Sequence, residues 1–291
     1  MENDLTVPSK ITLREMLEVG VHFGHRVQKW DPRMEPYIFT ARNGIHILDL
    51  QQTIVNLHQV HDMVRDRVMS GGTVLFVGTK RQAAETIAKE AARCGMPYVN
   101  VRWLGGTLTN WVTIRKRIDQ LKKLEQRRDK GEFARLTKKE ALTMEAEIEK
   151  LQLRLSGLRN MKRIPDFIFI VDTNREATAV KECNILGVPI IALMDSNCNP
   201  TEADYLLPAN DDAMRAISLM VAAMADAVLE GRAMRKGDEE DEFDTLEQAD
   251  LTRYDNLIEE DEESSDETYL GESTLAKIRR QKEILLEDRD K

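Results

Sequence analysis

The segment VHFGHRVQKWDPRM, residues 21–34, concentrates side chains that could bind or react. His22 and His25 are three residues apart, a spacing at which two imidazoles can share one metal ion. The same segment carries cationic and aromatic side chains that suit phosphate contacts and base stacking, namely Arg26, Lys29, Trp30 and Arg33. These residues fit a metal site, an active site or a nucleic-acid contact, and the segment alone does not distinguish the three.

A metal site has little further support in the sequence. His58 and His61 repeat the spacing of the first histidine pair, but no Cys or Glu follows either pair at a useful distance. Asp195, Asp211 and Asp212 could converge on a hard cation, but Asp211 and Asp212 fit better as the N-cap and first turn of the last helix. That cation site stays open, and elsewhere we expect no metal, no cofactor and no catalytic residue.

A nucleotide site is the next possibility. The segment TVLFVGTKRQAA places Gly78 between a strand and a helix, where an anion can bind the helix N-terminus. The dinucleotide fingerprint G-x-G-x-x-G and the P-loop pattern G-x-x-x-x-G-K-[ST] are both absent around this glycine. Lys80 and Arg81 therefore suit the phosphates of a nucleic acid better. A nucleotide-binding α/β enzyme or regulator that uses the turn at 78–81 is the alternative interpretation.

The elements that must position these residues follow a repeating order. Short apolar runs typical of buried strands occur at 73–79, 97–101, 166–172, 189–195 and 204–208. Helical patterns, most of them ended by Gly, occur at 12–20, 51–72, 80–95, 175–187 and 211–231. A β-rich segment is expected at 36–50, with Asn43-Gly44 as its turn. Continuous apolar strands separated by helices predict an α/β fold, in which a parallel sheet is flanked by helices.

Residues 111–163 interrupt this order. Apolar residues recur at steps of three and four in two stripes, which are Trp111, Ile114, Ile118, Leu121 and Leu124, then Ala141, Met144, Ile148, Leu151, Leu155 and Leu158. Gly131 separates the stripes, and Thr137 with Glu140 forms a capping box at the start of the second. We therefore expect an inserted antiparallel coiled-coil hairpin.

The predicted hairpin is strongly basic, with 16 Lys and Arg against 8 Asp and Glu. Such charges can simply keep a helix pair in contact with water. Here, however, the net positive charge of residues 1–236 is concentrated in this segment. The candidate phosphate contacts on the hairpin are Arg115, Lys116, Arg117, Lys122, Lys123, Arg127 and Arg128.

The charge of the chain also divides along its length. Residues 1–236 carry 35 Lys and Arg against 30 Asp and Glu, whereas residues 237–291 carry 7 against 21. A basic body with an acidic extension is typical of a protein that binds a polyanion. The extension has too few apolar residues to offset its ordering entropy. We therefore expect an α/β body at 1–110 and 164–236, the hairpin at 111–163, and an acidic, mostly disordered tail at 237–291.

The cysteines and the hydropathy of the sequence bear on the cellular location of the protein. Cys94, Cys183 and Cys198 are odd in number and form no C-x-x-C, which argues against a disulfide framework and a structural zinc site. No apolar run approaches the roughly 18 residues of a membrane span, and MENDLTVPSK resembles no targeting signal. We expect a cytoplasmic protein with no membrane partner that is not an obligate homo-oligomer.

Three long blocks, taken in order, resemble one known family. They are LEVGVHFGHRVQKWDPRMEPYIFTARNGIHILDLQQT (17–53), VRWLGGTLTNW (101–111) and PDFIFIVDTNREATAVKECNILGVPIIALMDSNCNP (165–200). These blocks resemble the signature blocks of bacterial small-subunit ribosomal protein S2, and the likeness runs from about residue 9 to residue 232. It does not extend to residues 238–291.

The resemblance implies a flavodoxin-like body with a protruding coiled-coil hairpin, bound to small-subunit ribosomal RNA and without catalytic activity. It also implies contact with other small-subunit ribosomal proteins and help in docking the mRNA-binding ribosomal protein S1. It favours the nucleic-acid interpretation of residues 21–34 and adds Arg102, beside Trp103 at the root of the hairpin, to the candidate contacts. In that setting Trp30 either stacks on RNA or anchors its loop to the body.

Overall fold

The computed structural model describes residues 11–235. Its helices are α1 (Leu13–Val19), α2 (Leu50–Met69), α3 (Arg81–Cys94), α4 (Trp111–Asp129), α5 (Lys138–Leu155), α6 (Ala177–Leu186) and α7 (Met214–Met234). Short 3₁₀ turns are η1 (Val27–Lys29), η2 (Pro32–Tyr37), η3 (Glu132–Arg135), η4 (Ser156–Leu158) and η5 (Pro200–Glu202). The expected acidic tail at 237–291 lies outside the described residues.

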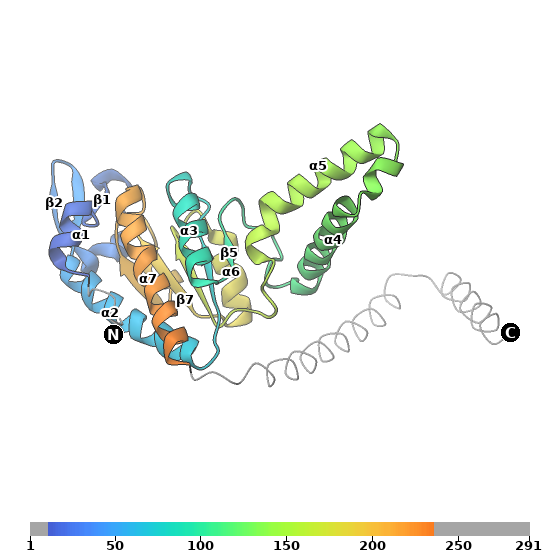
Figure 1. The fold of residues 1–291 in the computed structure, drawn as a ribbon. Helices are drawn as coiled ribbons and strands as arrows, with labels where there is room; N and C mark the ends of the chain where they lie inside the picture. Colours follow the sequence, from blue (N-terminus) through green and yellow to red (C-terminus); the bar gives the residue numbers. More distant parts are fainter. Residues whose placement is uncertain (1–10, 236–291) are drawn as a thin grey trace, which may run out of the picture. The chain divides into compact units, whose positions relative to one another are not determined.

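The centre of the fold is a parallel sheet of five strands (Figure 1). Its members are β4 (Val74–Val77), β5 (Tyr98–Val99), β6 (Phe167–Val171), β7 (Ile190–Met194) and β8 (Tyr205–Pro208). They lie in the order β5-β4-β6-β7-β8, and every neighbouring pair is parallel. This confirms the predicted α/β fold with a parallel sheet flanked by helices.

Alternating strand residues bury the two faces of the sheet. Val74 and Phe76 of β4 pack on the side covered by α1, α2, α3 and α7. Leu75 and Val77 face the other side, which is covered by α6, by the loop before α4 and by the adjoining ends of α4 and α5. Because both faces are covered, β4, β6 and β7 are buried along their whole length, as a continuous apolar run predicts.

A second, smaller sheet precedes the parallel one. It is antiparallel, with the order β1-β3-β2, and comprises β1 (Phe23–Arg26), β2 (Ile38–Arg42) and β3 (Ile45–Leu48). Asn43 and Gly44 both have positive φ, which confirms the predicted turn between β2 and β3. The segment 21–34 contains β1 and continues through η1 into η2, and its hydrogen bonds tie it to the loops that follow β7 and β8.

Helices α4 and α5 occupy the chain between β5 and β6, and we call them the α4–α5 insertion. The two apolar stripes meet: Leu121, Leu124 and Ile148 pack together with Phe133 of η3. The predicted capping box of Thr137 and Glu140 begins α5. Leu158 lies beyond α5 in η4, where it packs on the body instead of on α4 alone. The coiled-coil geometry of the insertion stays a prediction.

The N-terminus of α7 differs from the expectation. Asp211 and Asp212 were expected to cap this helix, but α7 begins at Met214 with Ala213 at its N-cap. Asn210 accepts hydrogen bonds from the amides of Asp212 and Ala213 at 2.8 and 3.1 Å. The N-cap prediction for the two aspartates was wrong because their carboxylates pair with Lys80 across the sheet edge instead.

Candidate functional site

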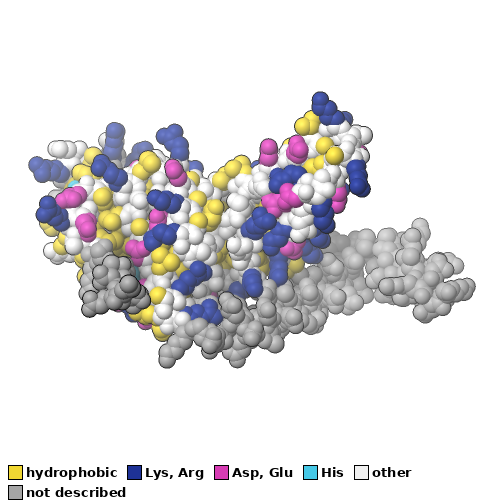
Figure 2. All heavy atoms as spheres, in the orientation of Figure 1, with side chains coloured by type: hydrophobic (Ala, Val, Ile, Leu, Met, Phe, Trp, Pro, Cys, Tyr) yellow, Lys and Arg dark blue, Asp and Glu magenta, His cyan; other side chains and the backbone are white. Residues whose placement is uncertain are grey.

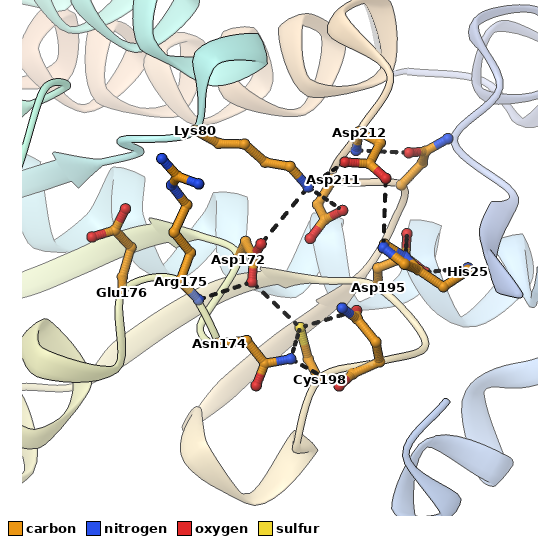
Figure 3. Close-up of polar contacts among 12 residues, drawn as sticks. His25, Lys80, Asp172, Asn174, Arg175, Glu176, Asp195, Cys198, Asp211 and Asp212 are labelled. Atoms are coloured by element: carbon orange, nitrogen blue, oxygen red, sulfur yellow. Dashed lines mark hydrogen bonds and ion pairs between the residues drawn. The ribbon is translucent and has the colours of Figure 1, made fainter. Parts of the chain in front are cut away.

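The carboxyl ends of the parallel strands bring charged residues together (Figure 3). Lys80, Asp172, Asp195 and Asp211 follow β4, β6, β7 and β8 respectively, each within three residues of the strand end. Parallel strands place these ends at one edge, where open α/β sheets usually bind ligands. His25 of β1 and Asp212 complete the group, which we call the strand-end cluster: His25, Lys80, Asp172, Asp195, Asp211 and Asp212.

The Lys80 ammonium forms ion pairs within this cluster. Its Nζ lies 2.8 Å from Asp211 Oδ1 and 3.7 Å from Asp172 Oδ2, and it also pairs with Asp212. Burial by itself would lower the pKa of Lys80, but hydrogen bonds to Asp211 and Asp212 outweigh it and raise that pKa to about 12. The Lys80 side chain is only 13% exposed, so the structure directs it into the acidic cluster and not toward an external phosphate.

Asp211 is a buried carboxylate that lies close to two others, those of Asp172 and Asp195. Its side chain is fully buried, and its Oδ2 has no hydrogen-bond partner in the part of the chain that the structure describes. Burial and repulsion by Asp172 and Asp195 raise the pKa of Asp211 to about 7, against the opposing effect of Lys80. One lysine therefore does not fully compensate the carboxylates at this edge.

His25 links β1 to the strand ends. Its backbone amide donates to Asp195 Oδ1 at 3.0 Å and to Ser196 Oγ at 2.9 Å. The ring Nδ1 lies 2.8 Å from Asp195 Oδ2, and Nε2 lies 3.5 Å from Asp212 Oδ2. The side-chain hydrogen bond with Asp195 is the largest cause of a raised pKa for His25. Sequence spacing suggested only His22 as a partner of His25. The residue that it contacts in the structure, Asp195, is 170 residues away in the sequence.

Gly24 makes the close approach of β1 possible. A Cβ at this position would lie 2.9 Å from Ser196 Oγ, 3.1 Å from Asp195 Oδ1 and 3.1 Å from the His46 carbonyl oxygen. Gly24→Ala is expected to destabilise the fold by about 1–3 kcal/mol because these atoms must give way. The midpoint of thermal unfolding measures this loss of stability.

Gly105→Ala is the matched control for that substitution. A Cβ on Gly105 meets no atom of residues 11–235 within 4 Å, so we expect a change within about 0.5 kcal/mol. Equal midpoints for the two alanine variants would contradict the close approach of β1 to the strand-end loops.

The turn after β4 was the position considered for a nucleotide. There the Thr79 amide donates to Glu176 Oε1 at 3.0 Å, and the Thr79 hydroxyl donates to the same oxygen. Burial raises the pKa of Glu176 despite these hydrogen bonds. A carboxylate of the chain itself therefore occupies the anion position of this turn, which leaves the nucleotide alternative without support.

A second buried carboxylate holds the loop that leads into α4. Glu182 of α6 accepts hydrogen bonds at 2.8–3.2 Å from one indole, three backbone amides and one hydroxyl, contributed by Trp103, Gly106, Leu108 and Thr109. Burial opposes the charge, but these hydrogen bonds outweigh it and hold the pKa of Glu182 below its usual value. The sequence analysis missed this residue, since no local pattern separates it from the other acids on amphipathic helices.

The candidate contacts in residues 21–34 lie in two environments. Arg26 at the end of β1 and Lys29 in η1 are exposed. Arg33 is exposed as well, but its guanidinium forms a two-point ion pair with Asp31 at 2.9–3.0 Å. Trp30 is half-buried with its ring centroid 5.0 Å from that of His46, so it packs within its own sheet region.

The remaining candidates lie on α3, on the loop before α4 and on α4 itself. Arg81 opens α3, and Arg102 lies beside the loop that Glu182 holds; both are exposed. On α4, the exposed members are Lys116, Arg117, Lys123 and Arg128, and the half-buried members are Arg115, Lys122 and Arg127. Arg127 pairs with Glu132 at 2.9 Å. Lys and Arg side chains are prominent over this insertion on the face drawn in Figure 2.

Comparison with known proteins gives one consistent result. The model of the family described as ribosomal protein S2 matches residues 16–231. Curated proteins named small ribosomal subunit protein uS2 are similar to this chain. Those of Maridesulfovibrio salexigens and Desulfovibrio desulfuricans are 54% and 56% identical over 228 and 226 residues, which is 78% of this chain and 88% of each relative. The protein of Roseiflexus sp. is 54% identical over 226 residues, 78% of this chain and 86% of the relative.

Proposed function

The chain belongs to the ribosomal protein S2 family, and we propose that it binds small-subunit ribosomal RNA and helps to dock the mRNA-binding ribosomal protein S1. Family membership makes it a structural constituent of the small ribosomal subunit, not an enzyme. Its proposed partners are the RNA and the other proteins of that subunit, and its proposed location is the ribosome in the cytoplasm. No helix among residues 11–235 is long and apolar enough to cross a membrane.

The α4–α5 insertion carries the RNA-binding part of the proposal. Residues 111–163 hold 16 Lys and Arg against 8 Asp and Glu, and Lys116, Arg117 and Lys123 are exposed on α4. An excess of exposed cations on one segment is the electrostatic pattern of a phosphate-binding surface. Double-helical RNA hides its base edges in a deep, narrow groove, so such contacts would recognise backbone shape and not sequence.

Two further surfaces support the same function. Arg102 is exposed and precedes Trp103, whose indole donates to Glu182, so it lies at the start of the loop that leads into the insertion. Arg26 at the end of β1 and Lys29 in η1 are exposed, and the strand-end cluster holds β1 in place. Lys80 is left out of the proposed surface because Asp211, Asp212 and Asp172 engage its ammonium. The docking of ribosomal protein S1 rests on the family resemblance alone.

Sedimentation of cell lysate through sucrose gradients tests the proposal directly. The chain is expected to migrate with small subunits in low salt and to dissociate progressively as salt rises, because phosphate contacts release counterions. Free protein at the top of the gradient at both low and high salt concentration would contradict the proposed binding to the small subunit. Loss of ribosomal protein S1 from small subunits depleted of this chain, and its return on adding the chain back, tests the docking part.

A further inference from the structure

The strand-end cluster has more negative charge than its cations balance. Four carboxylates meet there, from Asp172, Asp195, Asp211 and Asp212, and within residues 11–235 the only ammonium among them is that of Lys80 (Figure 3). His25 adds a positive charge only when it is protonated. A buried carboxylate without full compensation is costly, and a bound cation is the usual remedy.

The ligand atoms at one part of this cluster lie close enough to share an ion. One atom each from His25, Asp195 and Asp211 lies within 4.8 Å of the other two. Metal–ligand bonds of about 2.1 Å hold ligand atoms at most about 4.2 Å apart, so the three converge after movements of about half an ångström. The 2.8 Å between His25 Nδ1 and Asp195 Oδ2 already approximates the roughly 3 Å between adjacent ligands of an octahedral ion.

The unpartnered oxygen of Asp211 is a separate observation that points to a ligand. Asp211 is fully buried, Lys80 Nζ donates a hydrogen bond to its Oδ1, and its Oδ2 has no hydrogen-bond partner among the described residues. Buried polar atoms are rarely left unpaired, so such an atom requires an explanation such as an ion. From this convergence we propose that His25, Asp195 and Asp211 bind one divalent cation of the Mn²⁺ or Zn²⁺ type, while Asp212 orients His25 through its other ring nitrogen.

The donor set selects the type of cation. One imidazole among carboxylates suits Mn²⁺ or Zn²⁺, whereas Mg²⁺ prefers oxygen ligands and retained waters. A neighbouring set of Asp172, Cys198 and Asp211 also lies within 4.8 Å. Burial raises the pKa of the Cys198 thiol to about 12, so that thiol stays protonated and is a poor ligand. Asp212 is about half exposed, which gives the ion an entry path from solvent.

Mn²⁺ binding to the full-length chain tests this proposal, with free Mn²⁺ followed by electron paramagnetic resonance in excess Mg²⁺. The wild type is expected to bind one more Mn²⁺ than Asp211→Asn, and Asp212→Asn is expected to weaken that ion's binding by about tenfold. Asp62→Asn, at an exposed position on α2, is the control and is expected to bind as the wild type does. Carboxylates of residues 237–291 contribute equally to every variant, so the difference isolates the cluster.

Unfolding provides a second readout that does not depend on the metal count. Mn²⁺ is expected to raise the thermal midpoint of the wild type and of Asp62→Asn, because a ligand of the native state stabilises it. It is expected to raise that of Asp212→Asn less. If Asp211→Asn does not fold, the half-exposed Asp212→Asn still decides the question. Equal Mn²⁺ affinity and equal midpoint shifts in wild type and Asp212→Asn would overturn the proposal, and so would full displacement of Mn²⁺ by an equal concentration of Mg²⁺.

Discussion

A Glu182→Ala variant is expected to unfold about 10 °C below the wild type. The substitution removes the acceptor for the Trp103 indole and for the amides of Gly106 and Leu108, and it leaves these largely buried donors unpaired. Each unsatisfied buried donor costs about 1–3 kcal/mol, so a loss of at least about 3 kcal/mol is expected. A domain of this size loses roughly 2–4 °C per kcal/mol. Thermal unfolding followed by circular dichroism measures the change.

Two control variants test whether the loss of stability comes from the Glu182 carboxylate. Glu182→Gln keeps one acceptor oxygen and is expected to cost about half as much. Glu149→Ala, at an exposed position on α5, is expected to change stability by less than about 0.5 kcal/mol. Equal midpoints for Glu182→Ala and Glu149→Ala would contradict the role of Glu182 in holding the loop before α4.

The pH dependence of the Glu182 effect follows from its lowered pKa. A carboxyl whose pKa is lower in the folded than in the unfolded chain stabilises the fold above its unfolded pKa, here about 4.5. That contribution is lost as pH falls through the folded pKa. The stability gap between wild type and Glu182→Gln is therefore expected to be constant near neutral pH and to shrink below about pH 4.5.

Replacing Lys116, Arg117 and Lys123 together with Gln is expected to weaken binding to small-subunit ribosomal RNA by about tenfold or more. These three exposed cations lie on α4, and the removal of one cation–phosphate pair lowers the slope of log K against log salt by roughly 0.7–0.9. The slope is therefore expected to fall by about 2 in the triple variant. Equilibrium binding at several salt concentrations between about 50 and 200 mM measures both quantities.

A matched triple variant controls for the change in net charge. Lys89, Lys181 and Arg215 are exposed on α3, α6 and α7, which are not part of the insertion, and their replacement by Gln removes the same charge. The expected slope for this control stays within about 0.5 of the wild-type slope. If both triple variants lowered the slope equally, the α4–α5 insertion would have no special part in RNA binding.

Much of the fold was predictable because its signals are local. The apolar runs at 166–172 and 189–195 enclose the buried strands β6 and β7, and Gly95 and Gly187 end α3 and α6 with positive φ. The comparisons confirm the family resemblance seen in the three sequence blocks. The N-cap of α7 could not be predicted, since Lys80, which lies between β4 and α3 and is distant in sequence, pairs with Asp211 and Asp212.

Local patterns were enough to predict the parallel sheet and the family, because periodicity, glycine positions and long ordered blocks are properties of neighbouring residues. Which charges meet depends instead on the folded chain. Folding brings His25 to Asp195 and Lys80 to Asp211, pairs separated by 170 and 131 residues. It also turns Glu182 toward the loop before α4. Such pairings depend on strand order and burial, which no short stretch of sequence encodes.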